Sequence, residues 1–206
     1  AHSHCRWVKL LHLQRVLGLA QSLMWCIPTA RYLLGGLYAL LRGANNGDVR
    51  LGKQELLDLA ALRRLDEFPS RALLPVLPQA DYIMTSDASD FGWGASLHRS
   101  DGTLVTVPAS GFFSPREMRL PISSKECLGA VRGVTCYVDK LLDTNILFLT
   151  DSKNLVDVAA RMMSRSLDLQ IQWRTLQDLL RNFRCTATFR HLRGVLNVIS
   201  DYYSRL

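Results

Sequence analysis

Thr85–Ser96 reads TSDASDFGWGAS and directly follows Tyr82–Met84, a short run with apolar residues that has the character of a β-strand. Two aspartates, Asp87 and Asp90, therefore stand where a strand runs into a turn. Asp at the end of a strand is often a turn or cap residue, and this is our interpretation of Asp90. In open α/β sheets, however, ligands bind in the crevice at the strand ends. The role of Asp87 therefore depends on what the rest of the chain brings to this strand.

Outward from this stretch, strand and helix patterns alternate along the chain. Apolar runs bounded by turn residues predict strands, and apolar residues at three- and four-residue spacing predict helices. In chain order, the expected strands are 81–89, 92–100, 103–114, 145–152 and 185–192, and the expected helices are 123–142, 154–164, 167–183 and 197–206. Ser123 or Ser124 is expected to cap the first of these helices. The order β-β-β-α-β-α-α-β-α predicts an α/β fold, with a mixed five-stranded sheet flanked by helices.

The N-terminal part of the chain is predicted to be helical and separate from this sheet. Residues 10–41 have helical spacing, with Pro28 opening a second helix, and a further helix is expected at 52–68. We expect a helical region at 1–75 and an α/β domain at 81–206. The boundary is indicated by prolines, which neither a helix nor a central strand tolerates: Pro69, Pro75 and Pro78.

Composition limits the kind of protein this is. With 206 residues and 48% hydrophobic content, the chain can bury one good-sized core and carry a smaller second unit. No run of eighteen or more apolar residues occurs, so we predict no transmembrane helix and no membrane partner. The formal net charge of +7 and the isoelectric point near 9.4 favour an anionic partner, for which nucleic acid is the commonest candidate.

The cysteines indicate the compartment. The chain has five, an odd number, at wide spacing and without a C-x-x-C pair. This pattern indicates neither a disulfide framework nor a zinc knuckle. An intracellular reducing compartment fits best, and the sequence does not distinguish cytoplasm, nucleus and organelle matrix.

Four carboxylates can converge at one end of the sheet if the first and fourth expected strands are neighbours. Asp87 lies in the first expected strand, and Asp151 lies at the C-terminal end of the fourth. Glu126, early in the following helix, and Asp201, in the last helix, can point at the same place. Like charges at close range raise one another's pKa, so such a cluster needs counter-charge. Mg²⁺ prefers oxygen ligands, and a pair of ions about 3.5–4 Å apart can stabilise both the attacking and the leaving oxygen in phosphodiester cleavage.

Four segments resemble, in order and spacing, the RNase H domain of retroelement reverse transcriptases of the LTR and DIRS-like kind. The resemblance covers Asp81 to Leu206. Its segments are TSDASDFGWGAS, FFSPREMRLPISSKECLGAV, LFLTDSKNLVDVAAR and RHLRGVLNVISDYYSR. On this resemblance, the catalytic carboxylates that hold two Mg²⁺ ions, with Mn²⁺ as an alternative ion, fall on Asp87, Glu126, Asp151 and Asp201. The mobile histidine of the family falls on His191, and the asparagine that opens its last helix falls on Asn197.

The resemblance implies an activity. Enzymes of this family cut the RNA strand of an RNA–DNA hybrid by attack of a metal-activated water, which leaves a 5′-phosphate and a 3′-hydroxyl. The RNA strand would be recognised through its 2′-hydroxyls, with little dependence on base sequence. Glu117 competes with Glu126 for the metal role, but the segment Ser123–Val131 is the one that matches the glutamate-bearing helix.

The N-terminal region is similar to the helical thumb and connection that follow the polymerase palm in the same retroelements. The palm and its paired aspartates are absent from this chain, since Tyr137–Lys140 reads YVDK and lacks the second aspartate. We therefore expect no polymerase activity here, and a separate polymerase region is an expected partner. The chain also departs from the family at Arg193, where proline is usual, and at Ser200, where alanine is common.

Three functions from different classes remain open. The first, which we favour because all four carboxylates and the histidine are retained, is a Mg²⁺-dependent ribonuclease H within a larger reverse transcriptase. The second is a retroelement-derived domain recruited as a structural, RNA-binding component of a ribonucleoprotein particle such as a ribosome. The third is a helical interaction module in the N-terminal region, with the second domain as a passive platform.

Overall fold

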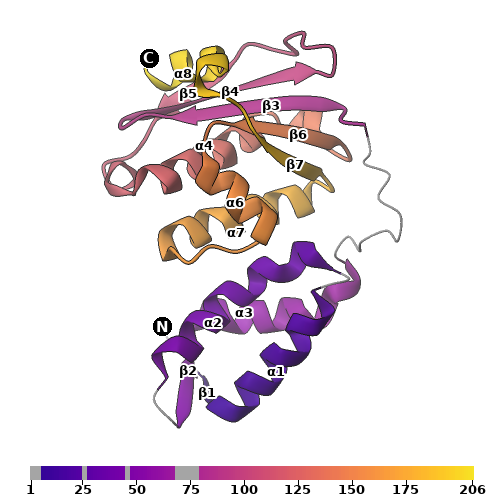
Figure 1. Cartoon of the computed structure of the whole chain (residues 1–206), viewed down its shortest axis with the longest axis vertical. Coiled ribbons are helices and arrows are strands. Elements are labelled where there is room, and N and C mark those ends of the chain that lie inside the picture. The colour runs from indigo at the N-terminus through magenta and orange to yellow at the C-terminus, as the bar shows by residue number, and fades with distance from the viewer. Residues whose placement is uncertain (1–5, 25–26, 45–46, 68–78) are drawn as a thin grey trace. The chain divides into compact units, whose positions relative to one another are not determined.

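The computed structural model describes residues 6–24, 27–44, 47–67 and 79–206, and the chain forms two compact units, Ala1–Pro75 and Val76–Leu206 (Figure 1). The predicted boundary prolines lie outside the described residues.

The first unit is helical, as expected, with one addition. Its helix α1 buries Leu13, Leu17 and Ala20, which share one face at three- and four-residue spacing. Pro28 opens the second helical segment, which begins as a short 3₁₀ helix and continues as α2. The unpredicted addition is an antiparallel two-stranded ribbon. The elements are β1 (Arg6–Lys9), α1 (Leu10–Leu23), η1 (Pro28–Leu33), α2 (Leu34–Gly43), β2 (Asp48–Leu51), α3 (Lys53–Ala61) and η2 (Leu62–Glu67).

The second unit confirms the predicted mixed five-stranded sheet with flanking helices. The strand order is β5-β4-β3-β6-β7, and β6 pairs in parallel with both β3 and β7. The strands are β3 (Tyr82–Ala88), β4 (Gly92–Arg99), β5 (Ala109–Phe112), β6 (Asn145–Thr150) and β7 (Thr186–His191). The helices are η3 (Glu117–Arg119), α4 (Ile122–Cys136), α5 (Val138–Leu141), α6 (Lys153–Arg161), α7 (Leu167–Asn182), η4 (Gly194–Leu196) and α8 (Val198–Ser204).

Helices cover both faces of this sheet. In Figure 1, α8 lies on one face, over β3, β4 and β5, and α4, α6 and α7 lie on the other. The core between sheet and helices includes the fully buried side chains of Met84, Phe148 and Trp173. Helix α4 approaches the sheet closely at Gly133, which has no side chain. A Cβ at this position would lie only 2.3 Å from Met84 Cε and 2.8 Å from Ala95 Cβ. The sheet is therefore a rigid platform for side chains at its strand ends.

Two local expectations were wrong. The third strand is limited to Ala109–Phe112, because the run before Pro108 makes only one isolated bridge, from Leu104 to His98. The serine cap of α4 is absent, because the helix begins at Ile122, directly after Pro121, and Pro121 makes no side-chain cap. Ser124 is instead fully buried. Among the helices of the described ranges, none combines the length and the apolar character needed to span a membrane.

Candidate active site

Strand register brings Asp87 and Asp151 together. β3 and β6 run in parallel, and Thr85 pairs with Leu149. Continuing that register by two residues places Asp87 level with Asp151, which follows the last residue of β6. The side chain of Asp87 is nearly buried, and burial together with the negative charge of Asp151 raises its pKa from 3.8 to about 6. The two strand-end aspartates are thus electrostatically coupled, as neighbouring carboxylates without a counter-charge must be.

Glu126 faces this pair from helix α4. Burial raises the pKa of its carboxyl, a hydrogen bond from the Ser152 hydroxyl opposes this, and the charges of Asp151 and Asp87 raise it further. The same Ser152 caps α6, since its Oγ accepts a hydrogen bond of 3.2 Å from the backbone N–H of Leu155. One serine therefore fixes the start of α6 and lies against the carboxyl group of Glu126.

Asp201 approaches the cluster from α8 on the other face of the sheet. Its carboxylate lies close enough to Asp87 for a hydrogen bond between the two carboxyl groups, which is a further cause of the raised pKa of Asp87. The pKa of Asp201 itself is lowered, mainly by hydrogen bonds from Arg205. Arg205 donates from Nε at 2.9 Å and from Nη2 at 2.7 Å, both to Oδ1 of Asp201. A guanidinium group thus holds the fourth carboxylate.

Helix α8 is fastened to β3 by two further side chains. Ser204 Oγ donates to Asp87 Oδ2 at 3.0 Å, and Asn197 Nδ2 donates to the backbone oxygen of Ser86 at 3.2 Å. Asn197 lies at the N-cap position of α8 but makes no capping bond, so it positions the strand beside Asp87 instead. Within the described part of the chain, its buried Oδ1 has no hydrogen-bond partner.

His191 lies at the same end of the sheet. It is the exposed last residue of β7 and pairs in register with Thr150, the residue before Asp151. The chain then passes close to Asp151. A Cβ on Gly194 would lie 3.2 Å from Asp151 Oδ2. The structure therefore gathers all five predicted site residues around the adjoining ends of β3, β6 and β7, although it does not test their roles.

Three carboxylates outside the cluster have structural partners: Glu117, Asp90 and Asp101. Glu117 accepts hydrogen bonds from the backbone N–H of Ser114 at 2.8 Å and from Arg132 Nη2 at 2.7 Å. These bonds hold the segment before α4 and point Glu117 away from a metal role. Asp90 accepts from Lys125 Nζ at 3.1 Å, and Asp101 accepts from the backbone N–H of Thr103 at 2.9 Å, as a turn residue does.

The donor set suits a hard divalent cation in its chemistry. It consists of carboxylate oxygens, and two of the carboxyl groups have raised pKa values, because they are buried and also lie near other carboxylates. In the part of the chain that the structure describes, no three His, Cys, Asp or Glu side chains are placed so that together they could hold one ion. One of the four carboxylates, Asp201, is instead paired with Arg205. A cation would require these side chains to rotate toward one another.

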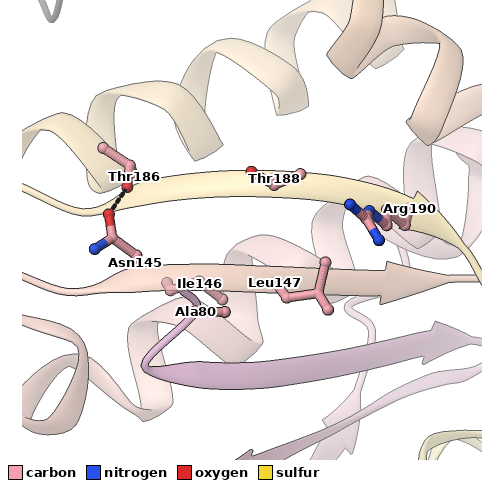
Figure 2. A pocket seen from close by; sticks show the side chains of 7 residues that line it. All are labelled: Ala80, Asn145, Ile146, Leu147, Thr186, Thr188 and Arg190. Carbon is pink, nitrogen blue, oxygen red and sulfur yellow. Dashed lines mark hydrogen bonds between the residues drawn. The ribbon is translucent and has the colours of Figure 1, made fainter. Parts of the chain in front are cut away.

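A separate pocket of ≈150 Å³ lies along β6 and β7 (Figure 2). Asn145 and Thr186 are hydrogen-bonded to each other at its start, and Arg190 lies at its other end (Figure 2). None of the residues that line this pocket is a carboxylate: Ala80, Asn145, Ile146, Leu147, Thr186, Thr188 and Arg190. It is therefore distinct from the acidic cluster.

The sequence reasoning did not identify three residues of the site: Ser152, Ser204 and Arg205. Ser204 and Arg205 follow Asp201 by three and four residues, the spacings that share one helix face. That spacing was a usable signal for contacts between Arg205 and Asp201. The contact of Ser204 with Asp87 depends on tertiary packing and had no local signal.

The raised pKa of Asp87 predicts how stability varies with pH. Between its unfolded value of 3.8 and its folded value of about 6, the native state holds more protons, so the charge of Asp87 costs stability as pH rises through this window. With a chelator present, Asp87→Asn should therefore raise the free energy of unfolding by about 1–3 kcal/mol at pH 7.5 and have little effect near pH 3.5. Urea unfolding at both pH values measures this.

The matched control for this comparison is Asp157→Asn, which changes an exposed carboxylate on α6. It should leave the free energy of unfolding within about 0.5 kcal/mol of the original at both pH values. An equal stabilisation by Asp87→Asn at pH 3.5 and pH 7.5 would contradict the inference that the ionised carboxylate of Asp87 destabilises the native state.

Comparison with known proteins gives the family of this arrangement. Residues 77–181 match the family described as RNase H-like domain found in reverse transcriptase. The enzymatic polyprotein of cauliflower mosaic virus (strain Strasbourg) is 28% identical over 203 residues, which are 94% of this chain and 28% of the polyprotein. The chain therefore spans little more than a quarter of the length of this curated relative.

Solved structures show the same fold. The N-terminal RNase H domain of the Mycobacterium tuberculosis protein Rv2228c has a TM-score of 0.52 at 19% identity, over 61% of this chain and 91% of that chain. LC11-RNase H1, in complex with an RNA/DNA hybrid, has a TM-score of 0.51 at 15% identity, over 59% of this chain and 92% of that chain. At these identities the likeness establishes the RNase H-like fold of the second unit and no more.

Proposed function

This chain belongs to the family of RNase H-like domains found in reverse transcriptase, and we propose that it is an endonuclease that cuts the RNA strand of RNA–DNA hybrids. The observation that carries the proposal is the convergence of Asp87, Glu126, Asp151 and Asp201. They come from β3, α4, the end of β6 and α8, and charges within this group contribute to the pKa shifts of Asp87 and Glu126. Four carboxylates from four elements have no structural reason to meet, because their mutual repulsion costs stability.

These carboxylates would hold the Mg²⁺ ions that the family uses, with Mn²⁺ as an alternative. When bound, a pair of ions supplies the charge that lowers the pKa of an attacking water and stabilises the leaving 3′ oxygen. The chain's own residues orient the carboxylates. Ser204 donates to Asp87 Oδ2, and Ser152 donates to Glu126, so each hydroxyl restricts the rotation of a carboxylate that would otherwise turn to solvent. His191 is exposed at the end of β7, beside the cluster, where a bound hybrid can reach it.

The substrate class follows from the family and from charge. LC11-RNase H1 is described in complex with an RNA/DNA hybrid, and we propose the same substrate class for this chain. The net charge of +7 favours binding to a polyanion even though the site itself is acidic. The RNA strand would be selected through its 2′-hydroxyls across the minor groove.

We also propose that this chain works beside a separate polymerase region. The match to the polyprotein covers 94% of the chain and therefore includes the helical first unit as well as the RNase H-like unit. This extended match favours a piece of a reverse transcriptase over a recruited component of a ribonucleoprotein particle. The intracellular reducing compartment that the cysteine pattern predicted belongs to the same proposal.

A direct assay tests this function. The chain is incubated with Mg²⁺ and a hybrid whose RNA strand is labelled, and with a duplex DNA of the same sequence. We expect RNA fragments with 5′-phosphate ends and an uncut DNA duplex. Absence of cleavage with either Mg²⁺ or Mn²⁺, in a chain that still binds structured RNA, would instead favour the recruited RNA-binding role.

His191→Ala should slow turnover and spare binding. His191 is exposed at the end of β7, so it adds little to the extended phosphate contacts that dominate affinity for nucleic acid. We expect kcat to fall about tenfold, because a proton carrier or a group that assists product release is lost. The affinity for the hybrid, measured by fluorescence anisotropy, should change less than about twofold. His12→Ala, at an exposed position on α1, is the control and should change neither quantity. Weakened binding with unchanged turnover would make His191 a structural residue.

A further inference from the structure

Arg205 is bound to one oxygen of a proposed metal ligand. Both of its hydrogen bonds, from Nε and Nη2, end on Oδ1 of Asp201, at 2.9 and 2.7 Å. Asp201 lies in α8, and Arg205 follows it by four residues, directly after the last residue of the helix, so the pair can form without help from other elements. Asp201 also interacts with the carboxyl group of Asp87.

The guanidinium group of Arg205 places a positive charge next to Asp201, at the edge of the carboxylate cluster. Among the described residues, Asp87, Glu126 and Asp151 form no ion pair with a basic side chain. Of the four carboxylates, only Asp201 does so there, with Arg205. A divalent cation that binds Asp201 would lie close to the guanidinium, and like charges repel. Cation and Arg205 therefore cannot both hold Oδ1.

Arg205 is free to leave this position. Its side chain is 68% exposed, against 46% for Asp201, so rotation into solvent removes no packing from the core. A pocket of ≈260 Å³ beside α8, lined by Arg205 itself together with Phe91 and Phe112, offers room for the displaced guanidinium. An exposed ion pair of this kind is weak enough for a divalent cation to displace.

We propose that Arg205 is a positioning residue that competes with the divalent cation for Asp201, and that it thereby sets the affinity of the carboxylate cluster for its ion. This inference rests on the proposed function, because it assumes that Asp201 is a metal ligand. Arg205 touches neither substrate nor reacting atoms in this role. It keeps Asp201 neutralised until a cation takes its place, and it weakens the apparent affinity for that cation.

Calorimetric titration of Mn²⁺ and Mg²⁺ into the full chain, without nucleic acid, tests this competition. Arg205→Gln should bind the cation about three- to tenfold more tightly than the original chain at low ionic strength, because a competing charge is gone. The difference should shrink in 0.5 M salt, where exposed charges are screened. Arg205→Lys keeps the charge but cannot present two donors to one oxygen, so its affinity should lie between those of the other two chains.

The matched control is Arg184→Gln. Arg184 forms an exposed ion pair with Asp143 before the first residues of β7 and β6, at the opposite end of the strands from Asp151. It removes the same charge from the chain and should leave cation affinity unchanged. Equal tightening by Arg184→Gln and Arg205→Gln would overturn the inference, because net charge alone would then explain the effect.

The titration separates failure of the competition from failure of the proposed function. If the original chain binds the cation and Arg205→Gln binds it no more tightly, the competition is refuted and the proposed function stands. If neither chain binds a cation at all, both are refuted. Tighter binding by Arg205→Gln alone, with an unchanged melting temperature in chelator, supports the competition and excludes a purely structural role for Arg205.

Discussion

Asp151→Asn is expected to reduce cleavage of the RNA strand on the order of a thousandfold or more, while the fold stays intact. Asp151 follows the last residue of β6 and lies level with Asp87 in the parallel register. An amide in its place keeps the size of the side chain and removes its negative charge, so the charge that would hold a divalent cation falls by one. The Ser152 cap of α6 and the Glu126 contact do not depend on that charge.

The measurement has two parts. Initial rates on a hybrid with a labelled RNA strand give the loss of activity, and circular dichroism with urea unfolding shows whether the fold is retained. Asp157→Asn, six residues later on the exposed side of α6, is the matched control and should cleave within about twofold of the original. Undiminished cleavage by Asp151→Asn would remove Asp151 from the metal site and would require another carboxylate in its place.

The order of the strands and helices could be read from the sequence because each element has a clear period. β6 alternates half-buried and buried residues from Asn145 to Thr150, and α7 buries Leu169, Trp173, Leu176 and Leu180 at helical spacing. Such a pattern shows which face of a strand or helix is buried. The pairing of β3 with β6 was a condition of the expected site and not a prediction, and the structure shows it.

The local expectations that were wrong concern short segments, where tertiary contacts outweigh propensity. β1 and β2 have four residues each, and their pairing joins segments separated by α1 and α2, so no nearby pattern predicted it. Ser124 has the residue type of a helix cap, but Pro121 already ends the extended chain, and the serine side chain turns into the core. A residue type alone does not show which way its side chain points.

Only part of the site could be predicted from the sequence, because some of its contacts depend on tertiary packing. The positions of Asp87 and Asp151 followed from strand ends, and those of Glu126, Asp201 and His191 came from the resemblance. Ser204 could not be found in either way, because its bond to Asp87 exists only when α8 lies flat on the sheet. That close packing depends on a glycine in β4.

Gly94→Ala is expected to lower the free energy of unfolding by about 2–3 kcal/mol and to reduce cleavage on the order of a hundredfold. Gly94 pairs with Asp87 across β3 and β4 and faces α8. A Cβ there would lie 2.4 Å from the backbone oxygen of Ser200 and 2.6 Å from the backbone nitrogen of Ser204. These are backbone atoms of a helix, so the added methyl group can be accommodated only if α8 moves as a whole.

The cleavage loss expected for Gly94→Ala has one cause, because alanine adds no charge and removes no polar group. Displacement of α8 carries Asp201 and Ser204 away from Asp87, and a shift of about 1 Å at reacting groups is enough to cost on the order of a hundredfold in rate. Gly18→Ala, where a Cβ would meet nothing within 4 Å, controls for the substitution itself and should be neutral or stabilising. Urea unfolding and hybrid cleavage measure the two effects together. Full activity in Gly94→Ala would mean that the position of α8 on the sheet, and with it Asp201, is not needed for catalysis.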